Sequence, residues 1–173
     1  FDRNSHHVHL SGIAVGAIGG GGGAVEPAQA VKVETLSTLA QNNFNNRGNS
    51  GLQTSKTYTY TLANGYKCAL SGWTHTRTYA KGFLRNQGGQ GKAVVSGLKA
   101  GQEYAYKVYQ YASSYAGKNK LTVNGKSMGK TDAKKSDDAA ASGKTVANSE
   151  GEIVLLFDRN SHHVHLSGIA VGA

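Results

Sequence analysis

The same seventeen-residue segment stands at both ends of this chain. Residues 1–17 and residues 157–173 both have the sequence FDRNSHHVHLSGIAVGA, without a mismatch and at an offset of 156 residues. An identity of this length within one short chain is not a coincidence, so any fold must account for two copies. The duplication has three simple explanations besides a functional one. The chain is a piece of a tandem-repeat protein, it is an engineered fusion or circular permutant, or the duplicated tail is disordered.

The C-terminal copy has the pattern of a closing β-strand. Polar and apolar residues alternate through HHVHL at 162–166, and the apolar run Ile169–Val171 follows, which predicts a half-buried strand. Asp158, Asn160 and Ser161 are turn formers, and the continuous apolar run Ile153–Phe157 before them predicts a strand buried on both faces.

The N-terminal copy carries the same apolar face and has to bury it as well. If one module has a single slot for this strand, the spare copy is expected to fill the slot of a neighbouring module, which links modules head to tail. The residues expected to make this contact are Val8, Leu10, Ile13 and Val15 of the first copy and Val164, Leu166, Ile169 and Val171 of the second.

A run of five glycines follows the first copy and suggests how the chain is divided. Such a run is too flexible to hold regular structure. We therefore expect residues 1–17 to belong to a neighbouring module, residues 18–29 to form a Gly-rich linker, and residues 30–173 to form the domain.

Turn signals punctuate the domain at short intervals. The threonine-rich stretch Lys56–Leu62 runs into Asn64-Gly65, and a second pair, Asn124-Gly125, separates two more short strand patterns. Asn-Gly between alternating segments is a strong hairpin signal. About ten short strands with almost no helical pattern predict an all-β fold, an antiparallel β-sandwich or jelly roll.

The segment SGLKAGQEYAYKV at Ser96–Val108 resembles part of extracellular β-sandwich modules of the fibronectin type III and galactose-binding-like classes. The resemblance implies that Leu98 and Tyr104 are core residues and that Gly101 makes the turn between them. In its tyrosine and lysine content the chain is also similar to secreted matrix and adhesive fibre proteins.

Charge and composition limit the partners. The formal net charge is +9, and the lysines are dispersed, with only Lys134 and Lys135 adjacent. No basic run, basic helix face or nucleic-acid motif is present, so no specific nucleic-acid partner is expected. The charge suits an anionic polysaccharide or mineral. No apolar run reaches the length of a membrane span, no catalytic motif or cofactor motif is recognisable, and the chain is expected to be extracellular and not an enzyme.

Three groups of residues are candidate sites, each with a simpler structural explanation. His163 and His165 would lie on one face of a strand and suit a shared metal ion, or they are ordinary strand histidines. Trp73, Tyr109 and Tyr111 would stack on sugar rings if exposed, or they belong to the core. The single cysteine, Cys68, would crosslink modules if accessible, or it is a small buried apolar residue.

The sequence therefore favours a structural, self-assembling extracellular module of a filament or tandem-repeat fibre, linked to its neighbours by strand complementation. The alternative is a carbohydrate-binding, lectin-like β-sandwich module.

Overall fold

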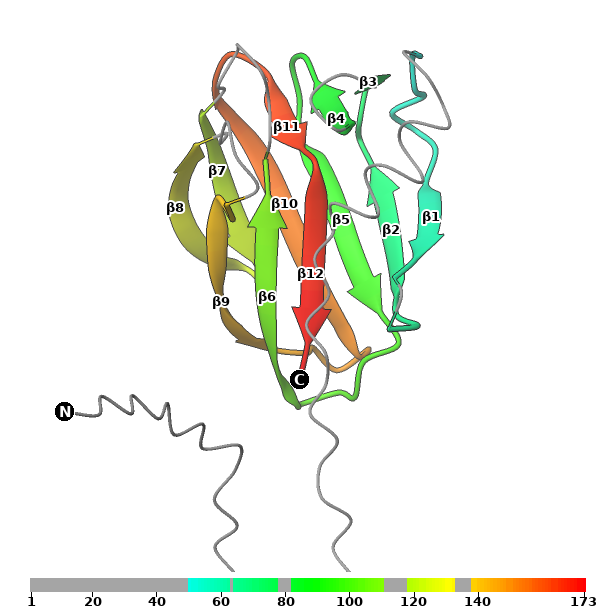
Figure 1. The fold of residues 1–173 in the computed structure, drawn as a ribbon, viewed down its shortest axis with the longest axis vertical. Helices are drawn as coiled ribbons and strands as arrows, with labels where there is room; N and C mark the ends of the chain where they lie inside the picture. The colour runs from blue at the N-terminus through cyan, green and yellow to red at the C-terminus, as the bar shows by residue number, and fades with distance from the viewer. Residues whose placement is uncertain (1–49, 63, 78–81, 111–117, 133–137) are drawn as a thin grey trace, which may run out of the picture.

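The computed structural model describes residues 50–62, 64–77, 82–110, 118–132 and 138–173. Regular structure in these ranges consists of twelve strands, and every paired neighbour is antiparallel (Figure 1). The all-β prediction is therefore confirmed. None of the described segments forms a helix with the length and apolar character that a membrane crossing requires.

A six-stranded sheet forms one layer, with the strands in the order β1-β2-β5-β10-β7-β8. Its strands are β1 (Tyr58–Thr61), β2 (Lys67–Ser71), β5 (Gly91–Ser96), β10 (Glu152–Ser161), β7 (Lys118–Val123) and β8 (Lys126–Asp132). The long strand β10 is central because Leu155 pairs with Ala93 of β5 on one side and with Val123 of β7 on the other.

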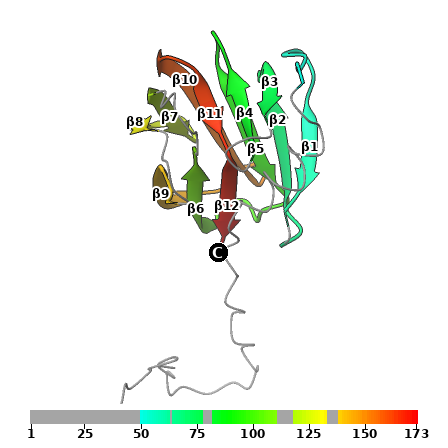
Figure 2. The same cartoon turned by 45° about the horizontal axis from the view of Figure 1, so that its top comes forward.

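Two three-stranded sheets form the second layer. One has the order β11-β4-β3 and the other β12-β6-β9, so that β12 and β6 lie in front of the large sheet in Figure 1 and stay on that side in Figure 2. The strands are β3 (His75–Arg77), β4 (Phe83–Asn86), β6 (Glu103–Tyr109), β9 (Ala141–Val146), β11 (Val164–Leu166) and β12 (Gly168–Gly172). The inward side chains of both layers form one continuous apolar core, which makes this a β-sandwich.

The C-terminal copy of the repeated segment supplies strands to both small sheets. β11 pairs with β4, the Ser167 amide donates to the Tyr109 carbonyl at 2.8 Å, and β12 pairs with β6. Every residue of both strands is buried. The prediction of a half-buried strand was wrong, because this segment packs into the interior on both faces.

The turn before this segment also lies later than the sequence suggests. Residues 158–161 continue β10, pairing with β7 through a bulge between Arg159 and Ser161. The chain reverses at His162, whose positive φ of 52° is typical of a tight turn.

Both Asn-Gly pairs lie in hairpins, as predicted. At the β7–β8 turn Asn124 and Gly125 both have positive φ, 45° and 77°, the signature of a type I′ turn. The Asn124 side chain also donates to the Val146 carbonyl and accepts from the Val154 amide, both at 2.7 Å, which fixes the hairpin to its neighbours. The first pair differs in detail, because the Gly65 amide bonds to the Leu62 carbonyl and makes a longer connection.

The residues that carried the family resemblance occupy the expected places. Leu98 and Tyr104 are buried, and Gly101 has a φ of 75° in the turn between them. The Tyr104 hydroxyl accepts a hydrogen bond from the Lys99 amide at 2.9 Å, so the tyrosine also closes the corner. The predictions for residues 1–17 and 18–29 lie outside the described residues.

Candidate functional site

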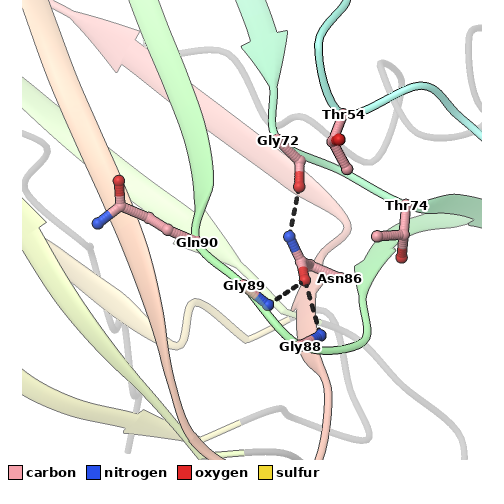
Figure 3. A pocket seen from close by; sticks show the side chains of 7 residues that line it. All are labelled: Thr54, Gly72, Thr74, Asn86, Gly88, Gly89 and Gln90. Carbon is pink, nitrogen blue, oxygen red and sulfur yellow. Dashed lines mark hydrogen bonds between the residues drawn. The ribbon is translucent and has the colours of Figure 1, made fainter.

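An open pocket lies at the end of the sandwich where β2 and β4 finish and β5 begins (Figure 3). We call it the rim pocket, and its volume is about 360 Å³. It is lined by two threonines, two carboxamide residues and three glycines, namely Thr54, Thr74, Asn86, Gln90, Gly72, Gly88 and Gly89. No charged side chain is among them.

One buried side chain shapes the loop that bounds this pocket. The Oδ1 atom of Asn86 accepts the amides of Gly88 at 2.9 Å and Gly89 at 2.7 Å, and its Nδ2 donates to the Gly72 carbonyl. Asparagine suits this position because its short amide bonds to backbone groups two and three residues later. Asn86 thus ties the loop to the end of β2, and its polar atoms serve the fold.

The segments that bound the pocket are anchored by an aromatic pair in the core. Trp73 is buried, its Nε1 donates to the Lys92 carbonyl at 3.1 Å, and its ring centroid lies 5.7 Å from that of Phe157. A Cβ atom at Gly91 would lie 2.5 Å from Cζ2 of Trp73, which explains the glycine there. Trp73 stands between Gly72 and Thr74, which line the pocket, so its packing holds this part of the lining in place.

The groups left to face a ligand are neutral. Thr54 and Gln90 are exposed, and the Thr74 hydroxyl donates to the Arg85 carbonyl at 2.9 Å. The Gln90 amide donates to Asp158 at 2.8 Å, while its carbonyl oxygen makes no hydrogen bond to the described residues. This lining suits an uncharged ligand that carries hydroxyl groups, because hydroxyl and carboxamide side chains can bond to such groups. The glycines have no side chain, so the ligand can approach the main chain closely.

The aromatic residues expected to stack on sugars do not offer a surface. Trp73 is 1% exposed and Tyr109 is 9% exposed, and both belong to the core, so the stacking role predicted for them was wrong and the core alternative holds. Trp73 lies in the connection between β2 and β3, and Tyr109 is the last residue of β6. Sequence alternation alone does not distinguish such positions from surface ones. Tyr111 lies outside the described residues.

The candidate metal pair does come together. The rings of His163 and His165 are 6.4 Å apart, and the Nδ1 atom of each is buried without a hydrogen-bond partner. His165 and Arg85 are directly opposite in the β11–β4 pairing, and Arg85 is opposite His75 in the β4–β3 pairing. Arginine between histidines opposes a metal cation, and the described residues contain no group of three or more metal-ligand side chains.

Burial and neighbouring positive charge both lower the pKa values of these histidines. The pKa of His165 is lowered to about 4, first by burial and then by the charges of His163 and Arg85. The pKa values of His75 and His163 are also lowered, each mainly by burial. All three favour the neutral form at neutral pH.

Cys68 has no access to solvent. Its exposed fraction is 0%, and burial raises the pKa of its thiol to about 12. A crosslink between modules needs an exposed thiolate, so that prediction was wrong and Cys68 is a buried apolar residue.

The expected contact strand is divided between described and undescribed residues. Val164, Leu166, Ile169 and Val171 are 0–1% exposed within their own sandwich. The corresponding residues of the first copy, Val8, Leu10, Ile13 and Val15, lie outside the described residues.

Sequence reasoning did not identify the rim pocket as a site. The signal available was an asparagine followed by glycines at residues 86–91, which is typical of a loop whose side chain bonds to its own backbone. The contributions of Thr54 and Gly72 come from elsewhere in the chain and could be joined to this loop only by the three-dimensional fold.

Comparison with known proteins gives distant likenesses of fold. No protein-family model matches the chain, and no curated protein matches it. Among solved structures, a family 35 carbohydrate-binding module from Clostridium thermocellum is 14% identical with a TM-score of 0.39, covering 72% of this chain and 97% of that one.

Two further structures give similar values. A family 35 carbohydrate-binding module from an environmental isolate is 14% identical with a TM-score of 0.35, covering 73% of this chain and 85% of that one. An exo-β-1,3-galactanase from Phanerochaete chrysosporium is 15% identical with a TM-score of 0.36, covering 72% of this chain and 27% of that one. These three are not fibronectin type III modules, and at such TM-scores the likenesses carry no conclusion about a ligand.

Proposed function

We propose that this chain is a non-catalytic, extracellular carbohydrate-binding β-sandwich module whose sugar site is the rim pocket. The observation that carries the proposal is the lining of that pocket, where the exposed Thr54 hydroxyl and Gln90 carboxamide stand beside glycines without a charged side chain. Sugars present many neutral hydroxyl groups, and a site of fixed neutral donors and acceptors matches them.

The rigidity of the site supports the same proposal. A sugar-binding site loses less entropy on binding when its loop is already held in place. Asn86 supplies this by its three bonds to backbone groups, and Trp73, between the lining residues Gly72 and Thr74, packs on Phe157 in the core.

A steric block at Gly88 tests the proposal. A Cβ at Gly88 meets no atom within 4 Å, so Gly88→Phe should fold normally and fill the pocket. Cathodic native electrophoresis in gels containing soluble galactan, xylan or glucomannan should show the full chain retarded by at least one of them. The Gly88→Phe variant should migrate as in an empty gel.

The matched control is Ser149→Phe, an equal addition at an exposed position near the opposite end of β10. It should be retarded as much as the unmodified chain. Failure of every polysaccharide to retard the chain, or equal retardation of Gly88→Phe, contradicts the proposal.

A second candidate function is a repeating structural module, and the two identical copies favour it. In a covalent array of period 156, the segment of residues 1–17 would be the closing strand of the preceding module. Each sandwich would then be completed by the copy at its own C-terminal end, as β11 and β12 complete this one.

Strand exchange between separate chains has weaker support. Replacing one copy by an identical copy leaves the buried contacts unchanged, while association of two chains costs about 4–15 kcal/mol in lost freedom. The copy already attached to the domain also has the higher effective concentration. Head-to-tail assembly would therefore need contacts beyond this strand.

Sedimentation velocity of the full chain and of residues 18–173 separates these arrangements. If both chains sediment as monomers, covalent repetition is the only form of the structural-module hypothesis that remains. Large species that disappear when residues 1–17 are removed would instead support assembly through the spare copy.

A further inference from the structure

A group of lysines lies beside the rim pocket on the outer face of the large sheet. Lys92 follows Gln90 by two residues, and the alternating pattern of β5 puts it on the exposed face. Lys120 and Lys130 are directly opposite each other in the β7–β8 pairing, and both are exposed. We call Lys92, Lys120 and Lys130 the lysine face.

The lysine face is connected to the pocket through one hydrogen bond. Gln90 lines the pocket and donates to Asp158 at 2.8 Å, and Asp158 is directly opposite Lys120 in the β10–β7 pairing. Ladder geometry places the Cα atoms of Lys92 and Lys120 roughly 12 Å apart, with β10 between them. Lys130 lies on the next strand, β8, at the edge of the sheet. A chain-like ligand that leaves the pocket in the direction of β8 would meet the three lysines in turn.

These positive charges lack partners in the described part of the chain. The carboxylate of Asp158 is bonded to Gln90, and the ion pair found among the described residues, Lys144–Glu103 at 3.2 Å, lies on the β6–β9 pair elsewhere. Like charges directly opposite each other, as Lys120 and Lys130 are, destabilise a sheet pair. An external anion would relieve this repulsion.

We propose that the module recognises acidic polysaccharides, with a neutral part of the sugar chain in the rim pocket and its carboxylate or sulfate groups over the lysine face. This rests on the proposed carbohydrate-binding function and names its ligand class. The cross-strand row that contains Lys92 also carries Ser71, Leu156, Thr122 and Ser127, without an aromatic ring for base stacking or an arginine for bidentate phosphate contact. The exposed arginine nearby, Arg159, donates to the Gln87 carbonyl at 3.4 Å. This composition favours a polysaccharide over a nucleic acid.

Three acidic residues lie near the lysine face. They are Asp158, Glu152 at the start of β10, and Asp132, which is opposite Lys118.

A matched pair of ligands isolates the charge. Polygalacturonate and its fully methyl-esterified form share one backbone and differ in the carboxylate. The full chain should bind polygalacturonate more tightly at 50 mM salt, and the difference should shrink at 500 mM salt because exposed charges are screened. Dextran sulfate against dextran makes the same comparison for sulfate, and single-stranded oligothymidylate is the nucleic-acid arm.

The triple variant Lys92→Gln/Lys120→Gln/Lys130→Gln should bind polygalacturonate about tenfold more weakly, as expected for the loss of three exposed ion pairs. Its binding to the methyl ester should not change. The control is Lys99→Gln/Lys107→Gln/Lys126→Gln, three exposed lysines outside the lysine face with the same total charge change.

Several outcomes overturn the inference. Equal losses in both triple variants would show a dependence on net charge alone, and equal affinity for acid and ester would show no recognition of the carboxylate. Tighter binding of the oligothymidylate would favour a nucleic acid. In each of these cases the proposed function still stands if the chain binds a neutral polysaccharide and Gly88→Phe abolishes that binding. If the chain binds no neutral polysaccharide in this way, both the proposed function and this inference are overturned.

Discussion

Acidification should destabilise this sandwich through the buried histidine of its closing segment. His165 is 2% exposed, with its ring edge-on to Phe83 at a centroid distance of 5.0 Å, and its pKa is lowered from 6.5 to about 4 by burial and by the charges of His163 and Arg85. The folded state therefore resists the proton that the unfolded chain accepts below pH 6.5. The stability that the neutral ring provides is complete above pH 6.5 and is lost progressively down to about pH 4.

The size of the effect follows from the shift. One pKa unit corresponds to about 1.36 kcal/mol, so the lowered pKa of His165 should remove about 3 kcal/mol from the free energy of unfolding between pH 6.5 and pH 4. The lowered pKa values of His75 and His163 act in the same direction. A loss of this size is a large part of the stability of an ordinary domain.

Urea unfolding followed by the fluorescence of the single tryptophan, Trp73, measures this at intervals from pH 7.5 to pH 4. In His165→Phe the pH dependence in this window should be reduced by about 3 kcal/mol relative to the unmodified chain. The control His162→Asn changes an exposed histidine at a positive φ that asparagine tolerates, and it should retain the contribution of His165 to the pH dependence.

Equal pH dependence in His165→Phe and the unmodified chain would refute this reasoning. NMR titration gives an independent check that needs no variant. The His165 ring should titrate near pH 4, and a midpoint near 6.5 would show that the ring is hydrated in solution.

Three further predictions concern the packing of the core. Gly91→Ala should lower the free energy of unfolding by about 1–3 kcal/mol, because its Cβ would press on Trp73, while Gly88→Ala should be neutral by the same urea assay; equal effects would contradict the close contact. Asn119→Leu should be neutral or stabilising, since both polar atoms of this fully buried side chain lack a partner, and a loss above about 1 kcal/mol would point to a buried water bonded to the amide. Cys68 should react with a thiol reagent only in urea, because its thiol is buried; rapid reaction of the native chain would reopen the crosslink hypothesis.

Local signals predicted local structure well. The Asn124-Gly125 turn was foreseeable because few residues other than asparagine and glycine adopt positive φ at two successive positions without strain. Leu98 and Tyr104 were identified as core residues by a resemblance over a short segment, and both are buried. These features depend on neighbours in sequence, so the sequence alone was enough.

Features that depend on distant pairing were not foreseeable. Residues 158–161 have turn-forming side chains, yet they extend β10 because β7 offers them a partner strand. The alternation of polar and apolar residues at His163–Leu166 suggested a strand with one solvent-exposed face, yet every residue of β11 is buried. Trp73 looked like a candidate for sugar stacking, and only its packing against Phe157 shows that it belongs to the core.

The same limit applies to the candidate site. Asn86 and its glycines were recognisable as a loop, but the partner of the asparagine amide is Gly72, at the end of another strand. The lysines appeared dispersed along the chain, and the pairing of β7 with β8 and β10 brings Lys120 and Lys130 together on the same sheet as Lys92. A site assembled from separate strands is visible only once the strand order is known.

The central structural claim is that the C-terminal copy closes the sandwich of its own chain, and amide hydrogen exchange tests this most directly. In a dilute monomeric sample, the amides of Ile169 and Val171 should exchange only through global unfolding, as expected for strand residues that are 0% exposed. Their protection should be the same at all protein concentrations and in a chain lacking residues 1–17. Protection that rises with concentration, or that is lost with the first copy, would show instead that the closing strand comes from another molecule or from the other end of the chain.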